Sequence, residues 1–117
     1  MKSKKVVKDC PFCEKNVVQR ESFYESNYSR ILYNIKPVYK GHVLVIPKSH
    51  KQDLINLTEK ERTDVFNTII ICKKIIQATY KKNACVILIQ DGEDAGQTIP
   101  HVHFHVVPLD GTRKTQR

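Results

Sequence analysis

Tryptophan is missing from this sequence, methionine occurs once, and glycine and proline together supply nine of the 117 residues. So few glycines and prolines exclude collagen-like and low-complexity chains. Apolar runs such as Val86–Ile89 are far shorter than the ~20 residues of a membrane-spanning helix. Lysines at the N-terminus are followed by no apolar segment, so we expect no secretory signal. With 40% hydrophobic and 27% charged residues, the sequence predicts one globular domain.

Acidic residues are absent from both ends of the chain, which are strongly basic. Residues 1–8 hold four lysines and residues 111–117 hold three basic side chains, so the tails carry seven of the eight net positive charges. Residues 9–110 hold thirteen basic and all twelve acidic residues, a net charge of +1. We therefore predict a single, nearly neutral domain over 9–110 with a basic tail on either side. This distribution argues against nucleic acid as the ligand.

Five short apolar segments separated by turn-forming residues predict β-strands. They cover Phe23–Glu25, Arg30–Ile35, Val43–Ile46, Cys85–Gln90 and His101–Pro108. One long helix stands between the third and fourth strands. Thr58 and Glu61 have the spacing of a capping box at its start, and apolar residues recur at intervals of three and four up to about Tyr80. This order indicates an α+β domain with an antiparallel sheet.

The apolar stripe of this helix is wider than the strip that one sheet face normally covers. It contains Val65, Phe66, Ile69, Ile70, Cys72, Ile75 and Ile76, and Ile71 widens it further. Two explanations stay open: a slightly irregular core, or a helix face that associates with a second copy of the chain. Cys72 lies in this stripe and Cys85 in a strand, and both are most simply core residues.

Three histidines alternate with apolar residues in the segment His101-Val102-His103-Phe104-His105-Val106. Because side chains of a strand alternate between its faces, the three imidazoles share one face and the apolar row faces the core. Three explanations compete: a solvated strand face, a metal site, or nucleophilic catalysis with different tasks for the three imidazoles. One metal ion cannot bind all three, since the outer two lie ~13 Å apart on an extended strand.

The loop Gln90–Thr98 precedes these histidines and contains two glycines, an amide and a hydroxyl close to them. Gly96 allows the backbone to approach a ligand closely, and Gln97 and Thr98 offer donors for phosphate oxygens or a leaving group. Such a loop is weak evidence by itself. Next to three histidines it favours a phosphate-binding function.

The segment Ala95–Val107 resembles the signature of the histidine triad family of nucleotide hydrolases and transferases, in which three histidines alternate with apolar residues. Asn34–Pro37 followed by Gly41–Lys48 resembles the other half of the family's site. Together the two motifs span most of the chain from Arg30 to Pro108. The resemblance implies a five-stranded antiparallel sheet with one long and one short helix, and two chains that pair into a continuous sheet.

The resemblance also implies a role for each site residue. The middle histidine, His103, attacks the α-phosphorus of an adenine nucleotide, which breaks a P–O or P–N bond and forms a nucleotidyl-histidine intermediate that water hydrolyses. His105 and His42 hold the ring and contact phosphate oxygens, and Gln97 contacts the leaving-group oxygen. The substrate-binding residues are Asn34 at the ribose, Thr98 at a phosphate, and Phe12, Leu32 and Ile35 around the base.

Two branches of the family share features with this sequence. Gln90–Gly92 and Ala95–Thr98 are similar to the fragile-histidine-triad branch, which cleaves diadenosine polyphosphates. Cys10–Cys13 and Pro47–His50 are more similar to the small nucleoside-phosphoramidase-like members. The substrate therefore stays open between a dinucleoside polyphosphate and a nucleoside phosphoramidate. A nucleotide-binding or scaffolding module with little turnover is the alternative function.

Cys10 and Cys13 form a C-x-x-C pair, which occurs in redox motifs and in zinc sites. A redox motif would open a long helix, and Asn16–Val18 gives little helical run. In zinc-bearing relatives two histidines complete a Cys₂His₂ site, and the resemblance places them at His50 and His101. We expect structural Zn²⁺ at this site; the alternative is a pair of free thiols.

The remaining expectations concern partners and location. The resemblance implies a homodimer formed through the helix Glu59–Tyr80 and the adjacent strand. Reduced cysteines in a chain without a secretory signal indicate the cytoplasm, with the nucleus also open. We expect a purine nucleotide as the substrate and no association with a membrane.

Overall fold

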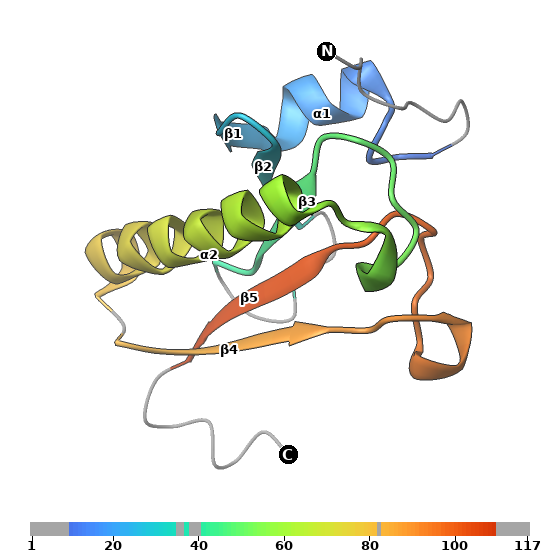
Figure 1. Cartoon of the computed structure of the whole chain (residues 1–117). Coiled ribbons are helices and arrows are strands. Elements are labelled where there is room, and N and C mark those ends of the chain that lie inside the picture. The colour runs from blue at the N-terminus through green and yellow to red at the C-terminus, as the bar shows by residue number, and fades with distance from the viewer. Residues whose placement is uncertain (1–9, 35–36, 38–40, 82, 110–117) are drawn as a thin grey trace.

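The computed structural model describes residues 10–34, 37, 41–81 and 83–109 (Figure 1). Both predicted basic tails and Ile35 therefore lie outside the described residues. In chain order the elements are α1 (Lys15–Glu21), β1 (Ser22–Glu25), β2 (Ser29–Tyr33), β3 (Val43–Pro47), the 3₁₀ turn η1 (Leu54–Asn56), α2 (Glu59–Tyr80), β4 (Ala84–Ile89), the 3₁₀ turn η2 (Glu93–Ala95) and β5 (Phe104–Leu109).

The five strands form one antiparallel sheet in the order β1-β2-β3-β5-β4. The predicted α+β class, the five-stranded sheet, the long helix and the short helix are confirmed. Strand β4 pairs with β5 on one side only, so it forms an edge of the sheet. None of the helices in the described part of the chain is long and apolar enough to cross a membrane.

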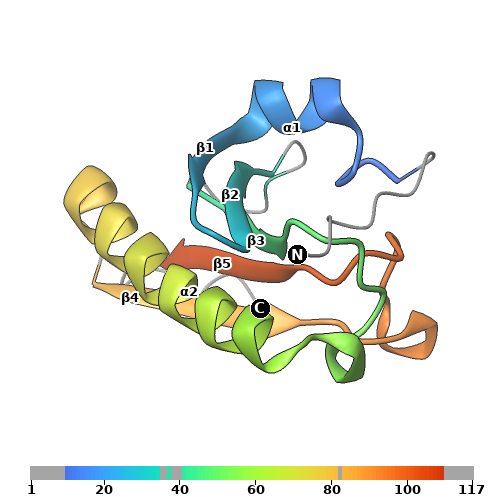
Figure 2. The same cartoon turned by 45° about the horizontal axis from the view of Figure 1, so that its top comes forward.

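The two helices cover opposite faces of the sheet (Figures 1 and 2). Because side chains alternate along β3, its residues belong to two core clusters, one on each face of the sheet. Val43 and Val45 belong to the cluster packed between the sheet and α2. Leu44 and Ile46 face the other way and pack with residues of the N-terminal segment before α1. One face of the sheet is therefore closed by the long helix, and the other is left for the N-terminal segment and the site.

Helix α2 begins and ends as the sequence predicts. The Thr58 side chain accepts a hydrogen bond from the Glu61 N–H at 3.1 Å, and the Thr58 N–H donates to the Glu61 carboxylate at 2.8 Å, so the capping box is complete. The helix ends at Tyr80, and Lys81 takes the left-handed conformation with φ 59°.

The wide apolar stripe of α2 does not become an irregular core. Val65 and Ile69 are buried against the sheet, but Phe66 is 62% exposed and Ile70 is 42% exposed. Each exposed residue follows a buried one by a single position, which turns it about 100° around the helix and away from the sheet. The core explanation is thus wrong for Phe66 and Ile70. Cys72 is buried in the core as predicted, and the half-buried Cys85 packs against this core cluster.

Two predicted strand boundaries differ from the structure by two residues or more. The second strand was expected to run to Ile35 and instead ends at Tyr33. The last strand begins at Phe104 and not at His101. On both sides of β5 the strand pairing ends at Phe104, which pairs with Ile89 of β4 and with Val45 of β3, so residues 101–103 have no strand partner. The Val102 N–H instead donates to the Lys51 carbonyl oxygen at 2.7 Å.

The region after the C-x-x-C pair is more helical than the sequence suggests. Helix α1 has seven residues, and Val18 on its inner side is buried. Its burial against the protein stabilises a helix that is too short to be stable by itself.

Candidate active site and metal centre

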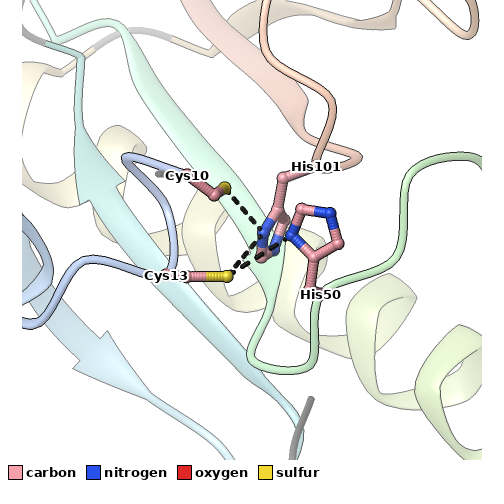
Figure 3. A group of neighbouring side chains, drawn as sticks. All are labelled: Cys10, Cys13, His50 and His101. Atoms are coloured by element: carbon pink, nitrogen blue, oxygen red, sulfur yellow. Dashed lines mark hydrogen bonds between the residues drawn. The ribbon is translucent and has the colours of Figure 1, made fainter. Parts of the chain in front are cut away.

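Four side chains from three separate segments converge beside the start of β5 (Figure 3). They are Cys10, Cys13, His50 and His101, and one ligand atom of each lies within 4.8 Å of all the others. The two cysteines share a tight turn, since the N–H groups of Cys13 and Glu14 both donate to the Cys10 carbonyl oxygen at 3.0 Å. The predicted metal ligands are therefore brought together by the fold.

The distances in this cluster fit a tetrahedral zinc site. Sulfur and nitrogen ligands at the usual Zn–S and Zn–N bond lengths lie about 3.5 Å apart at the corners of a tetrahedron. The His101 Nδ1 atom lies 3.4 Å from Cys10 Sγ and 3.6 Å from Cys13 Sγ. The Cys13 Sγ atom also lies 3.4 Å from His50 Nδ1.

The surroundings orient His101 as a ligand. Its Nε2–H donates to the Pro47 carbonyl oxygen at 2.9 Å, which leaves Nδ1 as the atom with a free lone pair. Burial lowers the pKa of His101 to about 4, so its imidazole is neutral at pH 7. Burial raises the pKa of the Cys10 thiol to about 11, so metal binding has to displace a proton there.

A second histidine cluster adjoins the first. The Nδ1 atom of His103 lies 2.9 Å from the His101 carbonyl oxygen. A carbonyl oxygen only accepts, so Nδ1 carries the hydrogen and Nε2 of His103 keeps its lone pair. Burial lowers the pKa of His103, which favours the neutral ring. The buried His103 therefore has the tautomer that a nucleophile attacking through Nε2 requires.

His105 lies next to this ring, and His42 lies next to His105. The ring centroids of His103 and His105 are 5.1 Å apart, and His42 Nε2 lies 3.0 Å from His105 Nδ1. Burial, followed by the neighbouring His103 and His42, lowers the pKa of His105 to about 4. The Asn34 amide nitrogen lies 3.1 Å from His42 Nε2. Residues just before β3, at the start of β5 and just after β2 thus form one continuous polar group.

His103 and His105 open into a cavity of about 360 Å³ between α1 and the sheet. Its lining consists of Pro11, Phe12, Val17, Glu21, Leu32, Tyr33, Asn34, Leu44, Thr98, Ile99, His103 and His105. The apolar majority with a few polar groups at one side is typical of a small-molecule site. Of the predicted substrate-binding residues, this cavity unites Phe12, Leu32, Asn34 and Thr98.

The predicted Gln97 lies outside the cavity lining. Its Oε1 atom accepts from the Gly92 N–H at 2.7 Å, and its Nε2 donates to the carbonyl oxygens of Gln52 and Ile99, both at 2.9 Å. In this conformation the amide braces its own loop. A contact of Gln97 with a leaving group stays a prediction.

A second glutamine of the same loop, Gln90, follows the end of β4. The antiparallel register of β4 and β5 ends with the pair Ile89 and Phe104, so Gln90 lies just beyond the last pair of the ladder. The exposed Gln90 side chain lies over Gly96, where an added Cβ would come within 2.6 Å of its Nε2. Gly96 has φ +96°, so both the space and the backbone there suit glycine.

Six cavity residues were not among the predicted site residues: Pro11, Val17, Glu21, Tyr33, Leu44 and Ile99. Val17 and Glu21 stand four positions apart on α1 and so share one face of that helix. A spacing of four brings Val17 and Glu21 onto one face only in a helix, and the sequence predicts little helix after the C-x-x-C pair. Tyr33 directly precedes Asn34 at the end of β2, and nothing in its local sequence marks it as a cavity residue.

Comparison with known families agrees with this geometry. The HIT domain family model matches residues 15–112. The asymmetrical bis(5'-nucleosyl)-tetraphosphatase of Schizosaccharomyces pombe is 43% identical over 91 residues, which are 78% of this chain and 50% of that protein. The chain spans between 24% and 50% of the length of the first curated relatives that it matches.

Two solved structures are similar over most of the chain. Plasmodium falciparum diadenosine triphosphate hydrolase, in complex with Cyclomarin A, has a TM-score of 0.78 and 32% identity, and the match covers 80% of this chain and 63% of that one. A Zn-bound histidine triad family protein from Mycobacterium smegmatis has a TM-score of 0.80 and 29% identity, with 91% and 78% covered.

Proposed function

This chain belongs to the HIT domain family, and from that premise we propose that it is a hydrolase of dinucleoside polyphosphates. The observation that carries the proposal is His103, whose Nε2 lone pair is available beside a cavity of nucleotide size. The names of two similar proteins, a bis(5'-nucleosyl)-tetraphosphatase and a diadenosine triphosphate hydrolase, favour a dinucleoside polyphosphate over a nucleoside phosphoramidate.

In the proposed reaction, Nε2 of His103 attacks the α-phosphorus of a purine nucleotide bound in the cavity. A P–N bond forms while the P–O bond to the leaving phosphate breaks, which gives a nucleotidyl-histidine intermediate. Water then attacks the same phosphorus, the P–N bond breaks, and a nucleotide and a proton are released. The hydrogen bond from His103 Nδ1–H to the His101 carbonyl stabilises the positive charge that develops on the ring.

The other side chains bind and orient the substrate in this proposal. His105 and His42 contact the phosphate oxygens, with Thr98 beside them and Asn34 at the ribose. Phe12 and Leu32 pack against the base, and Ile35, which lies outside the described residues, belongs to the same predicted set. Gln97 contacts the leaving-group oxygen if its amide releases one of its three hydrogen bonds.

The test is turnover by His103→Ala on two substrates, diadenosine triphosphate and an adenosine phosphoramidate. The proposal expects the variant to lose turnover of both while it still binds the product mononucleotide, because binding uses the rest of the cavity. Substantial hydrolysis by the variant would exclude His103 as the nucleophile. Tight mononucleotide binding by the wild type without turnover of either substrate would favour the alternative of a binding module.

We also propose that Cys10, Cys13, His50 and His101 hold a structural Zn²⁺ ion. The fit of their distances to a tetrahedron supports this, and so does the Zn-bound relative. A closed site of this kind would tie the N-terminal segment to the residues in front of β5. Metal-binding thiols have to be reduced, which supports the cytoplasm, or the nucleus, as the compartment.

A homodimer is the last part of the proposal. Phe66 and Ile70 on α2 and Val86, Ile87 and Leu88 on the edge strand β4 are exposed apolar side chains. An edge strand with unpaired backbone groups and apolar side chains is a favourable site for pairing with a second copy. Pairing there would extend the five-stranded sheet into the partner, as the family resemblance implies.

A further inference from the structure

The cavity has a histidine end and an opposite end that the proposed chemistry leaves unassigned. Register connects the two across the sheet, since His105 on β5 pairs with Leu44 on β3, and Leu44 pairs with Leu32 on β2. Two strand spacings separate β5 from β2 by roughly 10 Å. A nucleotide whose α-phosphate meets His103 therefore directs its base toward β2 and α1.

Glu21 stands at this opposite end. It is the last residue of α1, and the residue after it, Ser22, pairs with Leu32. Its side chain is 19% exposed and lines the cavity, and it is the only acidic residue of the described lining. A carboxylate taken this far out of water loses hydration that new hydrogen bonds have to replace.

The bonds that Glu21 makes within the protein leave capacity for a ligand. Its Oε2 atom accepts from Arg20 Nε at 2.9 Å. Arg20 is 64% exposed and does not line the cavity, so it approaches Glu21 from the solvent side. An ionised carboxylate can accept about four hydrogen bonds, and its two oxygens suit a pair of parallel donors.

Purine bases differ in the donors they present to such a group. The edge of guanine that lies farthest from the ribose carries two adjacent donors, the N1–H and the 2-amino group. Adenine presents one donor there, its 6-amino group, beside the N1 acceptor, whose lone pair repels a carboxylate oxygen. A carboxylate at the base end therefore fits guanine with two hydrogen bonds and adenine with one.

We propose that Glu21 reads the base and makes this cavity prefer guanine over adenine. The inference rests on the proposed function, which places a nucleotide here, and deepens it by naming the base. Glu21 acts in this proposal as a specificity-determining residue that touches the substrate far from the reacting phosphorus, so it affects the choice of nucleotide more than the chemical step.

The experiment measures the dissociation constants of GMP, AMP and IMP for the full chain by calorimetry. We expect GMP to bind about tenfold more tightly than AMP, since one good bidentate pair discriminates by that order. IMP keeps the N1–H and lacks the 2-amino group, so its affinity should lie between those of GMP and AMP. This comparison uses only the wild-type protein and does not depend on the folding of a variant.

The variant Glu21→Gln supplies the second arm. A glutamine amide offers one donor and one acceptor, which complements the N1 and 6-amino edge of adenine, so the preference should reverse toward AMP. Arg20→Gln is the matched control: it removes the same ion pair but keeps the carboxylate, and the preference for GMP should remain.

The outcomes separate this inference from the proposed function. Equal binding of GMP and AMP by the wild type overturns the inference alone. An equal loss of affinity for both nucleotides in Glu21→Gln, or a reversal in Arg20→Gln, assigns Glu21 a structural role and also overturns it. Failure of every mononucleotide to bind the wild type overturns the inference and the proposed function together.

Discussion

The imidazole of His103 donates to the backbone carbonyl of His101, and the side chain of that same His101 lies 3.4 Å from the Cys10 sulfur. One residue thus orients the proposed nucleophile with its backbone and joins the cluster of cysteines and histidines with its ring. Phe12 packs edge-on against both rings, with centroids 5.7 Å from His101 and 5.1 Å from His103. This candidate metal site and the cavity therefore have Phe12 in common, and disturbing the site should disturb the nucleophile.

Metal content is the first prediction. Purified wild-type protein should contain about one zinc per chain, and Cys10→Ser should lose most of it, because a hydroxyl replaces a thiolate in a tetrahedral Cys₂His₂ set. The variant should also unfold at a lower temperature. Cys85→Ser is the control. Cys85 lies in β4 outside the cluster, so this variant should keep its full zinc content. Elemental analysis decides, and full zinc in Cys10→Ser contradicts the assignment.

Acid should destabilise the protein through its buried histidines. The pKa of His105 is lowered to about 4, chiefly by burial, whereas an unfolded histidine titrates near 6.5. Between these values the unfolded chain binds a proton that the folded protein does not, so the free energy of unfolding falls as the pH drops from about 6.5 to 4. Above about 6.5 the group contributes no pH dependence.

Urea unfolding at a series of pH values measures how the free energy of unfolding changes with pH. Comparison with His105→Asn isolates the part of this change that His105 causes. The variant should show a shallower loss of stability in acid. An identical loss of stability in acid for the two proteins would contradict the lowered pKa of His105.

Sedimentation tests the dimer. Ile87 is 46% exposed on the edge strand β4, and Ile87→Lys places a charge in the proposed interface, so this variant should sediment as a monomer. Ile55→Lys is the matched control, because Ile55 is also exposed but lies in η1, outside α2 and β4. A wild-type protein that sediments as a single chain at all concentrations would contradict the dimer.

The two glutamines of the loop should behave differently when shortened. Gln97→Ala removes three hydrogen bonds inside the protein and should lower stability by about 1–3 kcal/mol. Gln90→Ala leaves those bonds in place and shortens an exposed side chain, so it should change stability little. Thermal unfolding of the two variants measures the difference. An equal loss of stability in Gln90→Ala and Gln97→Ala would contradict the bracing role of Gln97.

Local signals in the sequence were sufficient for much of this protein. The Thr58 and Glu61 capping box marks the start of α2, because its two hydrogen bonds join residues only three positions apart. The alternating histidines and the C-x-x-C pair identified the two clusters by residue type. The roles of the individual ligands came from resemblance to a family and not from spacing, since Cys10 and His101 are 91 residues apart.

Other features depended on how distant segments pack. Phe66 and Val65 are equally apolar neighbours, and only the direction of α2 over the sheet makes one exposed and the other buried. Residues 101–103 leave the strand because the neighbouring ladder has ended. Glu21 has no local mark of function and becomes a cavity residue through the placement of α1 and the pairing of β1 with β2. The sequence determined which chemical groups are present and where the local elements begin. The tertiary structure decided which groups meet, because contacts between distant residues depend on the packing of whole elements.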